Sequence, residues 1–191
     1  MPEDKELAET EHFSEEDYSD LVFAQRAWSL ELYDGRLRDK PPMTWGENGV
    51  QTELSFYLMD QLDQRQYHVF TFLRVRLSPG TILVPDVMVV PTRLGEPFHD
   101  QWDELAIFDD PLPLVADIVC AANDYDAAGK VANYQQRGDR EIWLVAPKQR
   151  TLTRWVRQAD GSYRESLHRD GIVHLSALPG VEIDLGRLFA G

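Results

Sequence analysis

The sequence predicts a mixed α/β (α+β) domain with a central sheet flanked by helices. Three nearly continuous apolar runs support this prediction: ILVPDVMVV (82–90), PLVADIVC (113–120) and EIWLVAP (141–147). Such runs are typical of strands that are covered on both faces. A helix-like segment separates the last two runs, which indicates a crossover between neighbouring strands. The 191 residues, 43% of them hydrophobic, suit one domain with a sizeable core.

The N-terminal half predicts a tail, a helix, a hairpin and a long helix. Residues 1–13 are acidic and weakly apolar, and we expect a flexible tail followed by a single domain over 14–191. Ser14 and Asp17 have the spacing of a capping box, which predicts a short helix from residue 14. Asp34-Gly35 predicts the turn of a hairpin over 28–39. Apolar residues at helical spacing then predict a helix over about 47–65.

The remaining segments alternate between strand and turn patterns. Residues 67–77 alternate as one strand, and 91–110 predict a long loop or flap. Asp124 is positioned to cap a helix that runs to about Gln136, and Gly138 is expected to end it. After the 141–147 run, the sequence predicts two alternating strands separated by a turn at 160–161, a further turn at 170–171 before the next apolar segment, and then a short strand or helical turn at the end.

Charge and cysteine content exclude several classes of protein. The formal net charge of -14 excludes a broadly basic protein that coats nucleic acid, but not a nuclease with local basic residues and a bound metal. A single cysteine, Cys120, excludes an intrachain disulfide and a cysteine-based zinc site. The sequence shows neither a signal peptide nor an apolar run long enough for a membrane span, so we expect a cytoplasmic protein.

Two acids inside the apolar runs indicate a possible cation site. Asp86 and Asp117 each lie in a run that predicts a buried strand, where an unpaired carboxylate is costly. If these strands are neighbours, both carboxylates can reach one Mg²⁺ ion, and Lys130 in the following helix can position a water or stabilise charge on a phosphoryl group.

Structural roles remain open for the same residues. Asp86 follows a proline, and the only role of its side chain can be a hydrogen bond to the backbone. Asp117 can pair with an arginine such as Arg140, and Lys130 can be a solvated helix residue. The histidines are scattered, and no Ser nucleophile elbow, Gly-rich phosphate loop or His-Glu-x-x-His motif occurs.

Six segments together resemble the Uma-two family of restriction-endonuclease-like proteins, within the PD-(D/E)XK nuclease superfamily. They are LELYDG, ENGVQTEL, VPDVMVV, PLVADIVC, DAAGKVANYQQRGDREIWLVAP and LPGVEIDLGRLF. The resemblance begins at about residue 14 and covers nearly all of the chain that follows. It implies a restriction-endonuclease-like core, with a mixed sheet flanked by helices and additional antiparallel hairpins, and a Mg²⁺ (or Mn²⁺) site.

The resemblance also implies roles for individual residues. Asp86 matches the first metal-binding acid and Asp117 the second, while the backbone carbonyl of Ile118 matches a further metal ligand. Lys130 matches a catalytic lysine carried by the helix, and Glu31 matches an acid that assists.

Several positions depart from the family pattern. Asp117 stands where glutamate is usual and is one methylene shorter. Val119 stands where the superfamily usually has its lysine, Cys120 where serine is usual, and Ala146 where an acid is often found. These departures bear on activity more than on fold.

Three hypotheses follow from the sequence. The first is a Mg²⁺-dependent endonuclease that hydrolyses DNA, and the second is a catalytically decayed protein with the same fold that acts as a binding or assembly module. The third is an enzyme that acts on another substrate, since a fold does not fix a function. A homodimer is expected for a nuclease that must reach both strands, with Trp102, Trp155 and Tyr163 as candidate interface residues.

Overall fold

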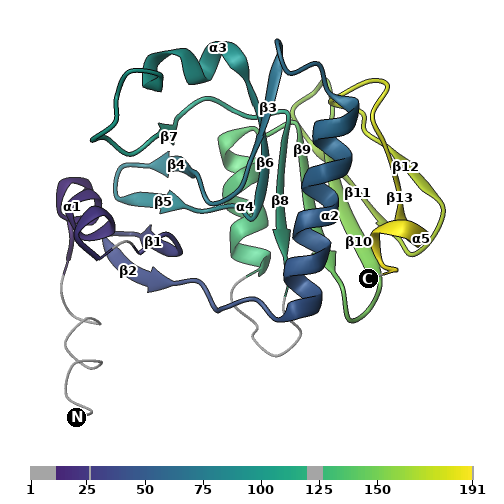
Figure 1. The fold of residues 1–191 in the computed structure, drawn as a ribbon, viewed down its shortest axis with the longest axis horizontal. Coiled ribbons are helices and arrows are strands. Elements are labelled where there is room, and N and C mark those ends of the chain that lie inside the picture. Colours follow the sequence, from purple (N-terminus) through teal and green to yellow (C-terminus); the bar gives the residue numbers. More distant parts are fainter. Residues whose placement is uncertain (1–11, 26, 120–126, 191) are drawn as a thin grey trace.

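A six-stranded mixed sheet forms the centre of the computed structural model, which describes residues 12–25, 27–119 and 127–190 (Figure 1). Across the sheet, the strands are β11 (Tyr163–His168), β10 (Thr151–Arg157), β9 (Glu141–Ala146), β8 (Leu114–Ile118), β6 (Val87–Pro91) and β3 (Tyr67–Phe70). Strands β8 and β9 are parallel, and the other neighbours are antiparallel. Helix α4 (Ala127–Arg137) connects β8 to β9, so the predicted crossover is confirmed.

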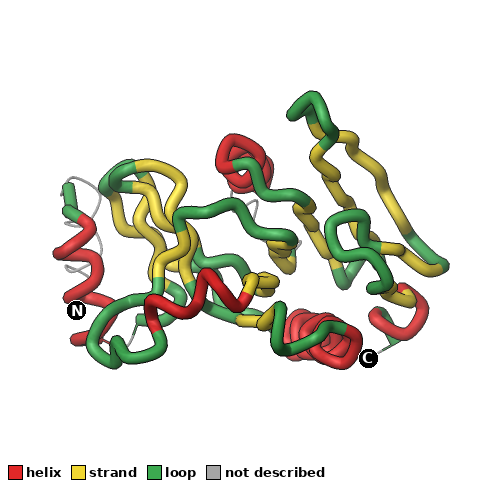
Figure 2. Tube along the Cα trace, turned by 90° about the horizontal axis from the view of Figure 1, so that it is seen from above, coloured by secondary structure: helices red, strands yellow, loops and turns green. Residues whose placement is uncertain are grey.

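Helices α2 (Trp45–Gln61) and α4 cover opposite faces of this sheet (Figure 2). The alternation of side chains along β6 shows why both faces must be covered. Val87 and Val89 pack into the core that contains α2, whereas Met88 and Val90 pack into the core that contains α4. Helix α2 begins with a Thr44–Glu47 capping box and ends at Gln61, a little before the predicted end.

A second, five-stranded sheet packs beside α1 (Glu15–Gln25) in the N-terminal region. Its strands, in order, are β2 (Arg36–Asp39), β1 (Leu30–Tyr33), β5 (Thr81–Leu83), β4 (Arg74–Ser78) and β7 (Ile107–Phe108). The Ser14–Asp17 capping box is present at the start of α1, and the predicted β1–β2 hairpin turns at Asp34-Gly35, both with positive φ.

The prediction of one strand over 67–77 is wrong, because the segment forms β3 in the central sheet and β4 in the second sheet. Phe72, with a φ of 60°, lies at the break between them. Arg74 then turns inward and donates to the Tyr18 hydroxyl at 2.8 Å. Alternation with a period of two continues through the break, so the sequence pattern did not reveal that the chain changes sheets.

The prediction of an irregular loop over 91–110 is also wrong in part. The segment contains α3 (Thr92–Gly95), η2 (Glu96–Phe98) and β7. Leu94, Phe98 and Phe108 pack on the core that contains α4, with the Phe98 and Phe108 ring centroids 5.4 Å apart. These apolar anchors hold the segment against the domain.

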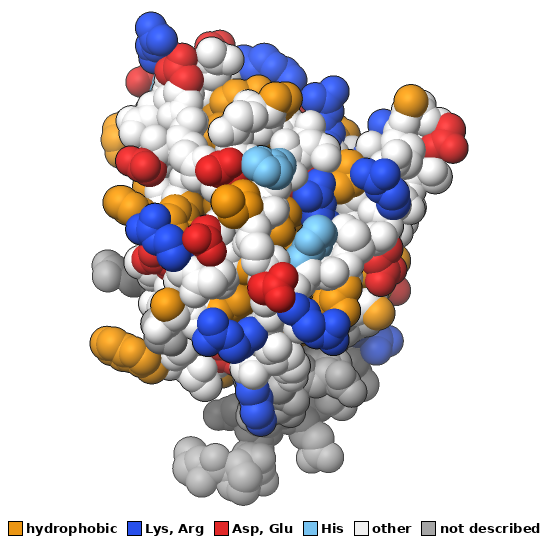
Figure 3. Space-filling model, turned by 90° about the vertical axis from the view of Figure 1, so that its right-hand side faces the viewer, with side chains coloured by type: hydrophobic (Ala, Val, Ile, Leu, Met, Phe, Trp, Pro, Cys, Tyr) orange, Lys and Arg blue, Asp and Glu red, His pale blue; other side chains and the backbone are white. Residues whose placement is uncertain are grey.

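The C-terminal segment closes the core that contains α2. The hairpin of β12 (Ile172–His174) and β13 (Glu182–Asp184) leads into α5 (Leu185–Leu188), whose two leucines are buried there. Figure 3 shows this side of the molecule, on which acidic and basic side chains are interspersed. Among the described residues, no helix combines the length and apolar character needed to span a membrane.

The structure describes some of the remaining residues named from the sequence and leaves others outside the described ranges. Of the three aromatic residues named as candidates for an interface, Trp102 is 88% exposed, whereas Trp155 and Tyr163 are partly buried. The Tyr163 hydroxyl donates to the Asp139 carbonyl at 2.6 Å, which fixes it within the fold. Cys120, the proposed cap Asp124 and residues 1–11 of the expected tail lie outside the described residues.

Candidate functional site

Asp86 and Asp117 lie side by side at one end of the central sheet. Strands β6 and β8 are antiparallel, and Val87 pairs with Ala116. The pairing therefore places Asp86 opposite Asp117, although the two are far apart in the sequence. Both residues are buried. The sequence-based expectation that these two acids come together is met by the geometry.

Protein donors orient one oxygen of each carboxylate. The Ile118 backbone N–H donates to Asp86 Oδ2 at 2.7 Å, and the Tyr134 hydroxyl donates to Asp117 Oδ2 at 2.8 Å. The side-chain amide of Gln51 donates to the Asp86 carbonyl at 2.9 Å, which links α2 to the same corner of the sheet. These contacts leave Oδ1 of both carboxylates directed toward a common cation.

That cation is the ammonium group of Lys40. Its Nζ lies 2.6 Å from Asp86 Oδ1 and 3.1 Å from Asp117 Oδ1, and it also donates to the Val84 carbonyl at 2.8 Å. Lys40 directly follows β2, and its backbone N–H donates to the Ser29 carbonyl at 3.1 Å. Its side chain is 9% exposed, so Lys40 is mostly buried together with the two acids.

Lys130 and Glu31 form the second ion pair of the site. Lys130 Nζ lies 2.7 Å from Glu31 Oε1 and 3.6 Å from Asp117 Oδ1. Glu31 Oε1 also accepts from the Val84 backbone N–H at 2.9 Å. Glu31 is fully buried on β1 and Lys130 is buried on α4, so two different sheets and a helix meet here.

The electrostatic environment separates the two aspartates. Burial raises the pKa of Asp86 to about 6, and the charge of Asp117 adds to this increase while Lys40 opposes it. Burial also acts against ionisation of Asp117, but Lys130 and Lys40, with the Tyr134 hydrogen bond, lower its pKa to about 2. Burial would lower the pKa of Lys40, yet the charges of Asp117, Asp86 and Glu31 outweigh burial and raise it.

The site has the donor chemistry for a divalent cation, but Lys40 holds the position between the donors. Carboxylate oxygens are the ligands that Mg²⁺ and Mn²⁺ prefer. Within residues 12–25, 27–119 and 127–190, no group of three or more His, Cys, Asp or Glu side chains is arranged to hold a metal. A metal site here would therefore use Asp86 and Asp117 after Lys40 had withdrawn, because an ammonium group and a metal cannot share the position.

Sequence reasoning found four members of the cluster and missed three. It identified Glu31, Asp86, Asp117 and Lys130, and it missed Lys40, Gln51 and Tyr134. Two sequence features could have pointed to missed residues. Tyr134 lies one helical turn after Lys130, and Gln51 lies on the apolar stripe of α2. No sequence pattern pointed to Lys40.

The structural roles suggested for these residues can also be checked. Asp117 pairs with Lys40 and Lys130, whereas Arg140 is exposed at the start of β9 and forms no ion pair among the described residues. Lys130 is 5% exposed, so it is not a solvated helix residue.

Comparison with solved structures supports the class of fold. The chain is similar to a protein from Anabaena variabilis ATCC 29413 whose crystal structure is titled "a putative nuclease belonging to DUF820", with a TM-score of 0.67 and 19% identity. The similarity covers 84% of this chain and 89% of that chain. The protein thus has a mixed α/β fold similar to that of the Anabaena variabilis protein, as the sequence predicted.

The family follows from the sequence itself. The model of the Uma2 family, described as "Putative restriction endonuclease", matches residues 15–186, and the chain belongs to this family. The resemblance seen in the six sequence segments is therefore confirmed. A comparison with curated proteins finds no match.

Proposed function

We propose that this protein is a divalent-metal-dependent endonuclease that hydrolyses phosphodiester bonds in DNA. The observation that carries the proposal is the pair of buried carboxylates, Asp86 and Asp117, whose Oδ1 atoms both contact one cationic group. The family and the fold agree with a nuclease. When bound, Mg²⁺ or Mn²⁺ would activate a water molecule and neutralise charge on the phosphoryl group.

In this proposal, Asp86 and Asp117 hold the metal, with the Ile118 carbonyl as a further ligand. The Ile118 N–H and the Tyr134 hydroxyl keep the two carboxylates oriented through their other oxygens. Such contacts typically change metal affinity or activity by about 10–100-fold when they are lost.

Lys130 is the residue we assign to the developing phosphate charge or to the attacking water. It lies on the Asp117 side of the cluster, 3.6 Å from Oδ1. Glu31 is a positioning residue, because its carboxylate accepts from Lys130 and from the Val84 N–H and so fixes the ammonium group beside the acids. A preorganised cation of this kind stabilises charge without reorganising during the reaction.

The charge balance of the cluster favours exchange of Lys40 for a divalent cation. With Glu31, Asp86 and Asp117 ionised and both lysines present, the cluster carries one net negative charge. Withdrawal of Lys40 leaves two negative charges, which one divalent cation neutralises. In this proposal the Lys40 side chain rotates out of the position, while its backbone N–H stays bonded to the Ser29 carbonyl.

A plasmid-nicking assay tests the proposal. Purified protein should nick supercoiled DNA with Mg²⁺ or Mn²⁺ and not with EDTA, and Asp86→Asn should lower the rate by at least about 100-fold because a metal ligand is lost. Asp20→Asn, an exposed acid on α1, is the matched control. Cleavage that persists in Asp86→Asn, or that needs no metal, contradicts the proposal.

A second function is favoured by Lys40 itself. If Lys40 stays between the two aspartates permanently, the cluster is a structural ion network, and the protein is a binding or assembly module without nuclease activity. The shortened acid at Asp117 agrees with this alternative. Calorimetric titration with Mn²⁺ separates the two functions: the nuclease requires binding at millimolar concentration or tighter, and the module requires none.

We also propose that the protein acts as a homodimer, so that two sites reach the two strands of DNA. Trp102 at 88% exposed is the remaining candidate for the interface among the three aromatic residues named from the sequence. Light scattering of the wild type and of Trp102→Ala tests this point, and a monomeric wild type contradicts it.

A further inference from the structure

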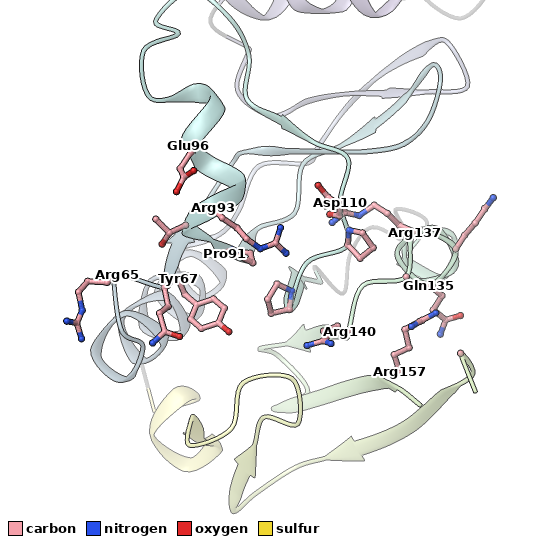
Figure 4. A pocket seen from close by; sticks show the side chains of 17 residues that line it. Arg65, Tyr67, Pro91, Arg93, Glu96, Asp110, Gln135, Arg137, Arg140 and Arg157 are labelled. Carbon is pink, nitrogen blue, oxygen red and sulfur yellow. Dashed lines mark hydrogen bonds between the residues drawn. The ribbon is translucent and has the colours of Figure 1, made fainter. Parts of the chain in front are cut away.

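A cleft of about 840 Å³ lies at the opposite end of the central sheet from the acidic cluster (Figure 4). Strand β6 starts beside Asp86 and ends at Pro91, which lines the cleft. Strand β8 begins just after Pro113, another lining residue, and reaches Asp117 near its end. At about 3.3 Å per residue, the length of either strand places the cleft on the order of 13 Å or more from the two aspartates.

The cleft is basic in a protein of net charge -14. Five arginines line it, against two carboxylates, Glu96 and Asp110. The five are Arg65, Arg93, Arg137, Arg140 and Arg157. A net positive lining in an otherwise acidic chain, gathered from several elements, is the electrostatic signature expected where an anion binds.

Two of the five guanidinium groups are already paired with carboxylates. Arg137 contacts both Asp139 carboxylate oxygens, at 2.6 and 3.0 Å, and donates to the Phe108 and Asp110 carbonyls. Arg65 contacts both carboxylate oxygens of Asp63 at 3.0 Å. These two arginines therefore contribute to the wall of the cleft rather than to binding.

The other three guanidinium groups lack a carboxylate partner among the described residues. Arg93 on α3, Arg140 before β9 and Arg157 at the end of β10 are exposed, and none takes part in an ion pair there. Arg157 donates its backbone N–H to the Arg140 carbonyl at 2.9 Å, so two like charges are anchored on neighbouring strands. A bound anion would relieve their repulsion.

The orientation of these side chains suits a ligand that carries phosphate. Figure 4 shows Arg93 and Arg140 reaching toward the same space from opposite sides, with Arg157 beside Gln135. A planar guanidinium matches a phosphate oxygen pair with two parallel hydrogen bonds. The Tyr67 ring also faces this space and offers a flat surface on which a base can stack.

We propose that this arginine cleft, defined by Arg93, Arg140, Arg157 and Tyr67, binds a nucleotide unit through its phosphate. The ligand is either a free nucleotide or one residue of a single strand, since both present the same phosphate and base. The cleft is separate from the acidic cluster, and its binding requires no metal.

The experiment measures binding in EDTA, so that neither metal nor cleavage contributes. ADP is titrated by calorimetry, and a short fluorescein-labelled oligothymidylate is titrated by fluorescence anisotropy at several salt concentrations. We expect a dissociation constant below about 1 mM for at least one probe. Arg140→Ala should weaken binding by about tenfold or more, and should reduce the salt slope of the oligonucleotide by about 0.7.

Controls identify the site and the source of the ligand. Arg36→Ala removes an exposed arginine from β2, in the other sheet, and should leave binding within about twofold of wild type. Tight ADP binding that Arg93→Ala and Arg140→Ala both weaken indicates a free nucleotide, whereas binding of the oligonucleotide alone indicates a strand. Failure of both probes to bind, or equal weakening by Arg36→Ala and Arg140→Ala, overturns the proposal.

Because the probes are used in EDTA, the result is independent of the nuclease proposal. A protein without nuclease activity that still binds ADP through Arg140 supports the cleft and rejects only the metal-dependent chemistry.

Discussion

Replacement of Lys40 by methionine tests how the acidic cluster is held together. The substitution keeps a long apolar side chain but removes the ammonium group that contacts Asp86 Oδ1 at 2.6 Å and Asp117 Oδ1 at 3.1 Å. Two buried carboxylates then face each other without their shared cation, and the Val84 carbonyl loses a donor. Loss of one partner of a buried ion pair typically costs about 3–5 kcal/mol.

The cost translates into a measurable shift in thermal unfolding. For a chain of this size, 1 kcal/mol corresponds to about 2–4 °C in Tm, so Lys40→Met in EDTA should melt about 6–20 °C below wild type. The lower part of this range applies near pH 6, because burial already raises the pKa of Asp86 to about 6 and a proton on Asp86 removes the repulsion.

Metal should restore part of this loss if the two carboxylates can act as ligands. At a Mn²⁺ concentration about 100 times the dissociation constant, the stabilisation is about 2.7 kcal/mol, or at least about 5 °C. The wild type should gain less, because the metal must first displace Lys40. Differential scanning calorimetry with and without Mn²⁺ measures both effects.

Lys148→Met is the matched control, since it removes one lysine from an exposed position after β9. It should change the Tm by no more than about 1–2 °C and should show no added response to Mn²⁺. If Lys40→Met and this control have the same Tm in EDTA, then Lys40 does not bridge the acids. If it is destabilised but Mn²⁺ restores nothing, the carboxylates do not form a metal site.

Three further predictions concern the same cluster and the core. The raised pKa of Asp86 predicts that its contribution to stability falls as the pH rises from about 4 to about 6. In urea titrations, the unfolding free energy of the wild type minus that of Asp86→Asn should therefore be smaller at pH 7 than at pH 4.5. An unchanged difference refutes the shift. Tyr134→Phe removes the donor to Asp117 Oδ2 and should lower the free energy of unfolding by about 1–3 kcal/mol, whereas a neutral effect would show that this hydrogen bond is not formed. Leu54→Ala, fully buried on α2, should cost about 2–5 kcal/mol in the same assay, against little change for the exposed Thr52→Ala.

Local patterns were sufficient for much of the fold. The Ser14–Asp17 capping box, the Asp34-Gly35 turn and the alternation along β10 and β11 act between residues close in sequence, and each was found where it was predicted. The change of sheet at Phe72 was missed, because a strand pattern does not specify which sheet receives the strand. The apolar anchors Phe98 and Phe108 were missed for a similar reason, since their partners are distant in sequence.

The sequence by itself determined that two acids lie in buried strands and that Lys130 lies in the helix that follows, and the family resemblance added Glu31 to them. Only the tertiary structure decided which cation neutralises these acids. Lys40 is far from Asp86 and Asp117 in the sequence, and it reaches them because the folded chain brings the end of β2 close to the start of β6. Burial makes a partner necessary, but the identity of that partner depends on distances that exist only in the folded chain.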